Sequence, residues 1–320
     1  MTLPVIRPAT MDDAALAADV MTESYPALPQ DPVMTAYYWA HVQEGHEVAR
    51  FLGDLDGRSV AYLSWLHGPW EKLPERHCDL EVWLARDRLD LDLITDLWTW
   101  IGARAEATGA LMLLAWVAED EVEMLAGLER LGYERDRYEK VWELDLKEHG
   151  RRLLAEAAET RTRPDAEGIR FSTLAEWDHP EKLLRLHQLN ELTKQDIPHT
   201  VPILPQSFED FESRALAPDR PHDRYWIALH GDAPVALSFL RFPPVRGSVW
   251  TGYTCCHPDY RGRGLARAVK LQSLAQAIEL GVPYVCTDND SENAPMLHIN
   301  ERLGYRRRPG FVALMKRVST

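Results

Sequence analysis

The sequence predicts a mixed α/β protein that consists of two similar halves in tandem. The tripeptide Leu-Gly-Tyr occurs at 131–133 and again at 303–305, each time after a helical stretch and before strand-like residues. In both halves the apolar residues change between the alternating spacing of strands and the wider spacing of helices. The length of 320 residues also allows two domains of the usual size, about 100–200 residues each.

The first half predicts strands and helices in mixed order. Glu47–Leu55 and Ser59–Leu66 alternate on either side of Asp56-Gly57, a sequence typical of a β-hairpin turn. Leu111–Val117 is almost continuously apolar, as expected for a buried strand. The other expected elements are a strand at Val5–Thr10, a helix at 12–21, a strand at Cys78–Leu84 and a helix at Leu91–Ala107. After each Leu-Gly-Tyr we expect two short strands.

The second half repeats this order. Its expected elements are a strand at Ile169–Leu174, helices at Pro180–Leu192 and Phe208–Leu216, strands at Tyr225–Leu229, Val235–Phe242 and Val249–Cys256, a helix at Leu265–Glu279, a strand at Tyr284–Thr287 and a helix at Pro295–Leu303.

A segment between the halves has the composition of a linker. Lys147–Glu167 is rich in Glu, Arg and Ala, and we expect it to be helical at first and loose near Pro164. The expected division is a first domain at 1–147, a linker at 148–167 and a second domain at 168–320. The alternative is that the segment is a surface helix of one large domain.

The charge and cysteine content exclude several classes of protein. A net charge of −14 disfavours nucleic acid and anionic membranes as partners and favours cationic ones. The longest apolar run, Ala110–Ala118, is too short to cross a bilayer, and the start of the chain lacks the pattern of a secretory signal. Four cysteines do not make a disulfide framework in a chain of this length. We therefore expect reduced thiols and a cytoplasmic protein.

The stretch with the most specific pattern is Tyr253–Lys270, YTCCHPDYRGRGLARAVK. A strand-like segment leads through Gly262 and Gly264 into an amphipathic helix. Glycines at a helix start let backbone N–H groups approach a ligand, and the positive end of the helix dipole favours a pyrophosphate there. The third glycine of the dinucleotide fingerprint is missing, because that position is Arg267.

At this stretch the sequence resembles the GNAT superfamily of acyl-CoA-dependent N-acyltransferases. Arg261, Gly264 and Ala266 match its Arg-x-x-Gly-x-Ala pyrophosphate loop, and the likeness continues through Asn293 to Leu303-Gly304-Tyr305. The resemblance implies tandem domains, each with a mostly antiparallel central sheet flanked by helices, in an arrangement similar to that of mycothiol synthase. It also implies acetyl-CoA as the acyl donor. The resembling loop implies contacts to CoA from a set of residues: Cys255, Cys256, His257, Arg261, Gly262, Arg263, Gly264, Leu265, Ala266 and Asn293.

The first half lacks this loop. The corresponding stretch, Ala85–Asp92, contains three aspartates and no glycine, so its carboxylates would repel a pyrophosphate and its Cβ atoms would obstruct close approach. We expect a degenerate first domain that is structural or forms one wall of the substrate pocket.

The resemblance leaves the acid and the base of the reaction open. Aminolysis of a thioester needs a group that takes the proton of the amine. Asp288, after a strand, is the first candidate for this base, and His257 is the second. The position where many family members carry an acidic tyrosine is Asn300, which we expect to orient CoA by hydrogen bonding, although Tyr253, another tyrosine or a water could supply the proton instead.

The acceptor is expected to be a primary amine of a small cationic metabolite or antibiotic. Glu191 and Asp196 lie in the loop that usually shapes the acceptor pocket in this family, where they could attract a cation. The alternatives are a protein lysine or N-terminal amine as acceptor, or a protein that senses acyl-CoA without transfer. We expect no metal, because Cys255 and Cys256 point to opposite faces of a strand. A monomer and a homodimer are both open.

Overall fold

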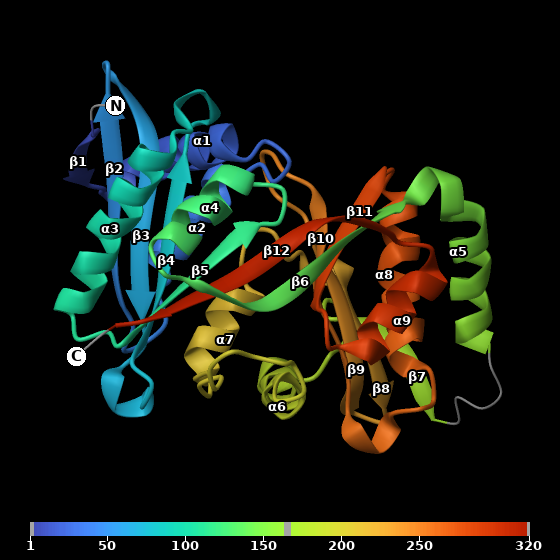
Figure 1. The fold of residues 1–320 in the computed structure, drawn as a ribbon. Coiled ribbons are helices and arrows are strands. Elements are labelled where there is room, and N and C mark those ends of the chain that lie inside the picture. The colour runs from blue at the N-terminus through green and yellow to red at the C-terminus, as the bar shows by residue number, and fades with distance from the viewer. Residues whose placement is uncertain (1–2, 163–167, 319–320) are drawn as a thin grey trace.

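The computed structural model describes residues 3–162 and 168–318 (Figure 1), so residues 163–167 of the predicted linker lie outside the described part. The strands are β1 Val5–Pro8, β2 Glu47–Leu55, β3 Arg58–His67, β4 His77–Leu84, β5 Met112–Ala118, β6 Glu134–Asp145, β7 Ile169–Thr173, β8 Tyr225–His230, β9 Ala233–Arg241, β10 Val249–Cys256, β11 Tyr284–Asp290 and β12 Arg306–Arg317. The α-helices are α1 Ala14–Ser24, α2 Pro32–Ala40, α3 Leu91–Ala107, α4 Val122–Arg130, α5 Leu146–Thr162, α6 Lys182–Lys194, α7 Phe208–Ala215, α8 Leu265–Glu279 and α9 Ala294–Leu303.

The described strands form one mixed sheet that runs through both halves. Their order is β1-β2-β3-β4-β5-β12-β6-β11-β10-β9-β8-β7. The β4–β5 and β10–β11 neighbours are parallel, and the remaining neighbours are antiparallel. The predicted mixed α/β class is thus confirmed, and the sheets of the two halves are joined into one.

The halves exchange their last strands at the centre of this sheet. β12, which ends the second half, pairs with β5 of the first half, and β6, which ends the first half, pairs with β11 of the second. β6 and β12 also pair with each other, so they lie side by side in the middle of the molecule (Figure 1). Each half therefore needs the other half to complete its sheet.

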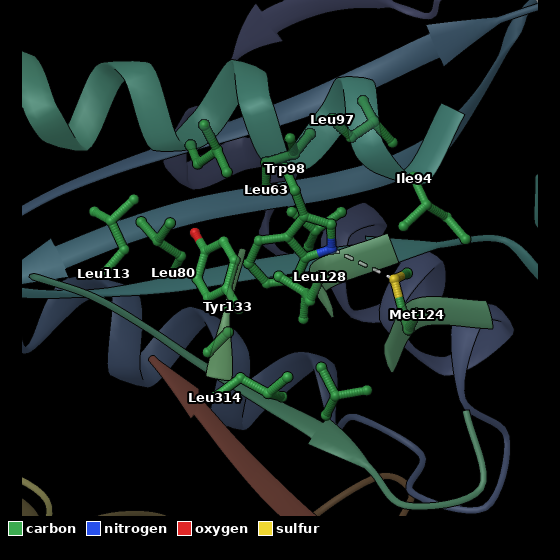
Figure 2. Packing of buried hydrophobic residues seen from close by; sticks show 14 of the residues in the cluster. Leu63, Leu80, Ile94, Leu97, Trp98, Leu113, Met124, Leu128, Tyr133 and Leu314 are labelled. Atoms are coloured by element: carbon green, nitrogen blue, oxygen red, sulfur yellow. Dashed lines mark hydrogen bonds between the residues drawn. The ribbon is translucent and has the colours of Figure 1, made fainter. Parts of the chain in front are cut away.

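The hydrophobic cores show the same exchange. The core under α3 contains Trp98, Tyr133 and Leu128 of the first half, and it also contains Leu314 of β12 (Figure 2). In the second half, Trp142 and Leu144 of β6 pack with Leu271 and Leu274 of α8. Because the hydrophobic effect stabilises these contacts in proportion to the apolar area buried, both cores depend on residues of the other half.

Two features differ from the sequence expectations. α2 was not expected, since Pro32–Ala40 is mostly apolar and aromatic; it begins at Pro32 after Asp31, whose carboxylate caps it by accepting the N–H groups of Val33 and Met34. β6 and β12 are single long strands where two short runs were expected; they pair with each other across two bulges, where the register shifts between Arg308 and Phe311 and between Ala313 and Leu314. None of the described helices is long and apolar enough to cross a membrane.

Candidate functional site

The loop before α8 has the backbone geometry of an anion-binding site. Gly262 and Gly264 both have a positive φ, +75° and +78°, which side chains with a Cβ rarely adopt. Gly264 is also the N-cap of α8 and offers no side chain, so no side chain caps the first N–H groups of the helix. A Cβ added at either glycine would meet open space. The loop therefore presents N–H groups and the positive end of the helix dipole to a ligand.

Two parallel strands separate next to this loop. β10 and β11 pair only at Val249–Val285 and Trp250–Cys286, and then they diverge. Gly252 forms a bulge in β10 at this point, and a Cβ there would lie 2.0 Å from the Phe239 ring, so no larger residue fits. The two strands therefore leave an opening between them.

A cleft of about 880 Å³ extends from this opening to the start of α8. Its walls come from the loop after α6, from β10, from the loop before α8, and from β11 with the start of α9. The predicted site residues on these walls are Asp196, Tyr253, Cys255, Cys256, Arg261, Gly262, Gly264, Leu265, Ala266, Asp288 and Asn293. The fold thus brings together residues that lie nearly 100 positions apart in the sequence.

The hydrogen bonds of β10 show that some of the predicted CoA-binding residues have no free backbone N–H group. The N–H of His257 donates to the carbonyl of Val235 in β9 (2.8 Å), so it is not available to a ligand. N–H groups of alternate residues point the same way along a strand. The N–H of Cys255 therefore also faces β9, whereas those of Thr254 and Cys256 face the open edge. Thr254, which was not predicted, and Cys256 are therefore the backbone donors that β10 offers to a ligand, and Cys255 and His257 are not.

The charged residues of the loop are only partly free. Arg261 lines the cleft and forms an ion pair with Asp196, so the predicted substrate-binding carboxylate is neutralised by a predicted CoA-binding arginine. Arg263 does not line the cleft; its guanidinium lies 5.4 Å from the centre of the Tyr260 ring. Asn293 lines the cleft and caps α9 by accepting the N–H of Met296.

Two predicted residues have structural contacts instead of ligand contacts. Asn300 is completely buried, and its amide donates to Asn289 (2.6 Å), so the expected hydrogen bond to CoA is not available to it. Glu191 pairs with Lys194 and does not line the cleft. It holds the loop after α6 and does not offer a charge to the substrate.

The candidates for acid and base differ in position. Asp288 lines the cleft just beyond the point where β10 and β11 separate, and burial raises its pKa above the ordinary value. Tyr253 also lines the cleft, and its hydroxyl contacts that of Thr193 (3.1 Å). The ring of His257 does not line the cleft; it accepts the N–H of Asp259 and caps a short 3-10 helix. The structure therefore gives His257 a structural position.

One residue of this cleft was missed entirely. Glu139 of β6 lines it together with Asp288, and the two carboxyl groups form a hydrogen bond. No local signal marks Glu139, because it belongs to the first half and reaches the cleft only through the exchanged strand.

The cysteines and other metal-ligating side chains do not form a metal site in the described residues. No group of three or more His, Cys, Asp or Glu side chains there could hold an ion. Cys255 is buried, which raises the pKa of its thiol to about 12 and makes it a poor nucleophile.

The corresponding loop of the first half is closed to anions. The N-cap of α3 is Asp90, whose carboxylate accepts the N–H of Leu93 (3.1 Å). This carboxylate occupies the place that a phosphate would take at a helix start. Asp87 in the same loop forms an ion pair with Arg58.

A second cavity, a chamber of about 420 Å³, lies between the two halves. Its first-half wall includes His77 and Asp79 of β4, and its second-half wall includes residues of α6 and α7. Gly252 and Tyr253 line both the chamber and the cleft, so the two cavities adjoin at the bulge of β10.

One family model matches part of the second half. Residues 186–305 match the model of the acetyltransferase (GNAT) family. The match includes the loop, β10, β11 and α9. The comparison with curated proteins gives no match.

Solved structures show the fold of the whole chain. A tandem GNAT protein from the clavulanic acid biosynthesis pathway is 17% identical, with all of this chain and 99% of that one covered at a TM-score of 0.78. A GCN5-related N-acetyltransferase from Sphaerobacter thermophilus is 18% identical, with 100% and 98% covered at 0.68. A glucosamine N-acetyltransferase region of a fungal multi-domain β-N-acetylglucosaminidase is 12% identical, with 98% of this chain and 38% of that one covered at 0.66. The chain therefore has the tandem GNAT fold.

Proposed function

We propose that the protein is an acetyl-CoA-dependent N-acetyltransferase that acts on a primary amine of a small cationic molecule. The observation that carries this proposal is that a cleft with a pyrophosphate-binding loop adjoins a polar chamber at Gly252 and Tyr253. A donor in the cleft and an acceptor in the chamber would meet where β10 and β11 separate.

The residues of the cleft fit an acyl-CoA. The N–H groups from Gly262 to Ala266 would hold the pyrophosphate, and those of Thr254 and Cys256 would bind along the open edge of β10. The thioester supplies an activated acetyl group. Since α3 of the first half is capped by Asp90, the proposal requires one such site per chain.

The carboxyl groups in the cleft favour a cationic acceptor. Glu139, Asp288, Asp290 and Glu292 all line the cleft near the start of α9, and Arg137 pairs with Asp290 and Glu292. Four carboxyl groups share this one arginine, so the cluster keeps a negative charge that attracts a protonated amine.

The charge of the chamber does not by itself favour a cation, because Lys194, Arg214 and Arg220 line it. The carboxyl group of Asp79 in the chamber has no hydrogen-bond or ion-pair partner among the described side chains, and burial raises its pKa to about 7. A ligand amine or hydroxyl group could satisfy it. The first half would then form one wall of the acceptor site.

Titration of acetyl-CoA into the protein by calorimetry tests the donor site. One site per chain is expected. Two sites would show that the first half also binds the donor, and the absence of binding would overturn the acetyltransferase proposal.

Thiol release from acetyl-CoA with a panel of amines then tests the acceptor. The panel should hold diamines, amino sugars, amino acids and a lysine peptide. Turnover with a small amine supports the proposal, turnover with the peptide alone favours a protein acceptor, and binding without turnover favours an acyl-CoA sensor.

Asp79→Asn tests the chamber with whichever small amine is turned over. We expect KM for the amine to rise on the order of 10-fold, the effect of one lost charged contact, while the Kd of acetyl-CoA stays unchanged. Asp178→Asn, an exposed position that lines neither cavity, is the control. An unchanged KM in Asp79→Asn would place the acceptor elsewhere.

A further inference from the structure

The exchanged strand β6 carries a carboxyl group of the first half into the cleft of the second. Glu139 lies opposite Asp290 in the β6–β11 register, and Asp288 lies opposite Val141. Residues two apart on a strand share a face, so Glu139, Asp288 and Asp290 project from the same face of the sheet. Glu139 and Asp288 are diagonal neighbours, close enough for direct contact between their side chains.

The backbone beside Glu139 is shaped to hold it there. β12 bulges between Arg308 and Phe311, and Gly310 in this bulge lies against the backbone of Glu139. A Cβ at Gly310 would lie 2.1 Å from the carbonyl oxygen of Glu139, so a larger residue would push β6 away from its position. The three strands thus fix Glu139 at the cleft with little freedom to move.

The charges around the pair leave it without a direct cation. Asp290 is bound by Arg137 (2.8 Å), which also binds Glu292 (3.0 Å). The cations whose charge reaches Asp288 are Arg241 of β9 and Lys270 of α8, and among the described residues neither forms an ion pair with it. Glu139 and Asp288 instead satisfy each other by a hydrogen bond, which requires that one of the two carboxyl groups is protonated.

We propose that Glu139 and Asp288 act as one proton-accepting pair for the amine, so that the base of the second half's reaction is completed by a residue of the first half. This inference rests on the proposed N-acetyltransferase function and adds a residue to it. The pair lines the cleft beside the point where β10 and β11 separate. Tyr253, at the same point, lines both the cleft and the chamber.

The chemistry balances without any other reactant. A bond forms between the amine nitrogen and the acetyl carbon, and the carbon–sulfur bond breaks with its electron pair leaving on the thiolate. The proton released by the nitrogen passes to the carboxyl pair and then to solvent, while the thiolate takes a proton from solvent.

The environment suits the pair to this task. Burial and the neighbouring carboxylates of Asp288 and Asp290 raise the pKa of Glu139 to about 8. Above this pKa the pair has lost its shared proton, and the base that results accepts a proton more effectively than an ordinary carboxylate does. The value belongs to the pair, because two groups that share a proton titrate together.

Kinetics of Glu139→Gln and Asp288→Asn test the proposal. We expect each variant to lose kcat on the order of 100-fold at about pH 8, and the double variant to lose little more, because the two residues work as a unit. In Glu139→Gln the acid limb of the pH profile should also move to lower pH, because Asp288 loses its like-charged neighbour. If Glu139→Gln keeps the wild-type kcat and pH profile, the proposal that the two residues act as one base is wrong.

Glu143→Gln is the matched control. Glu143 lies on the same face of β6 but pairs with Arg308 (3.4 Å) and does not line the cleft. It should keep wild-type kinetics. Acetyl-CoA binding should be unchanged in all the variants, so a failure of the proposed function, seen as no binding or no turnover in the wild type, is distinguished from a failure of the pair.

Infrared spectroscopy tests the shared proton without any substrate. The wild type at about pH 7 should show a protonated carboxyl band that remains after the spectrum of Glu139→Gln is subtracted and that disappears above about pH 9. The subtraction removes the bands of Asp79 and Glu121, whose pKa values are about 7. A wild-type spectrum without this band would overturn the pair, whatever the kinetics show.

Discussion

The glycine at the start of α8 combines two properties that a ligand loop needs. Gly264 has a φ of +78°, and a Cβ there would project into open space, which here is the cleft. A side chain would therefore both strain the backbone and occupy the place of the phosphates.

Gly264→Val should weaken acetyl-CoA binding by at least about 100-fold, because it removes close contact with backbone N–H groups. Gly57→Val is a matched control for strain, since Gly57 has a φ of +79°, is equally open and lies in the hairpin of the first half. Calorimetry should show normal affinity in this control and in Leu89→Ala, which changes the corresponding loop of the first half. Equal loss in Gly264→Val and Gly57→Val would mean that strain, not the site, is responsible.

The burial of Lys270 should make the free energy of unfolding depend on pH. Lys270 is completely buried in α8 and its amine has no hydrogen-bond partner in the described structure, so burial lowers its pKa from 10.5 to about 7. Asp288 is the anion whose charge opposes this shift. Between about pH 7 and pH 10.5 the unfolded chain binds this proton and the folded chain does not, so this residue makes stability rise with pH there.

Lys270→Met should remove that slope, which reaches about 1.4 kcal/mol per pH unit. The variant should be more stable than the wild type below about pH 7, and the difference should shrink as the pH rises toward 10.5. Denaturant unfolding at several pH values measures this. A difference that stays constant with pH would show that Lys270 keeps its charge when folded.

Single residues also show what the sequence could and could not predict. The loop of Gly262 and Gly264 was predictable because its chemistry depends on neighbours in the chain. The burial of Asn300 was not, since it depends on which side of α9 faces β11. Glu139 was not either, because its place in the cleft results from pairing between strands about 150 residues apart.

At the level of elements, the exchanged strand β12 links the stability of the two halves. Its Leu314 is completely buried in the core of the first half, although it lies near the end of the chain (Figure 2). The elements were mostly predicted in type and place, because their apolar spacing is local. The exchange was not, since the local apolar spacing does not indicate which sheet the strands after the two Leu-Gly-Tyr repeats join.

Leu314→Ala should lower the free energy of unfolding by about 2–5 kcal/mol, the usual cost of a cavity in a core. Hydrogen exchange should become faster in α3, which packs on the same core. Leu216→Ala, at a position that is 54% exposed, is the control and should cost little. Faster exchange confined to the second half would contradict the exchange of strands.

At the level of the whole molecule, the two halves form one unit. α5, most of which falls in the predicted linker, packs Leu153 and Ala157 into the core of the second half. The side-chain amide of Gln272 in α8 donates to the carbonyl of Ala157 (3.0 Å), and Glu156 pairs with Arg267. The first 162 residues therefore supply both a strand and a helix to the fold of the second half.

This arrangement predicts that two fragments of the chain fold when they are expressed together but that the second fragment does not fold properly alone. Residues 1–162 and 168–320, expressed together as separate chains, should form a stable one-to-one complex, because β6, β12 and α5 cross the division and bury apolar surface on the other fragment. The complex should bind acetyl-CoA as the intact chain does. Residues 168–320 alone lack β6, so β11 becomes an open edge and Glu139 is missing; we expect this fragment to aggregate or to dimerise. Size-exclusion chromatography measures the outcome, and two fragments that elute separately as folded monomers would show that the halves are independent domains.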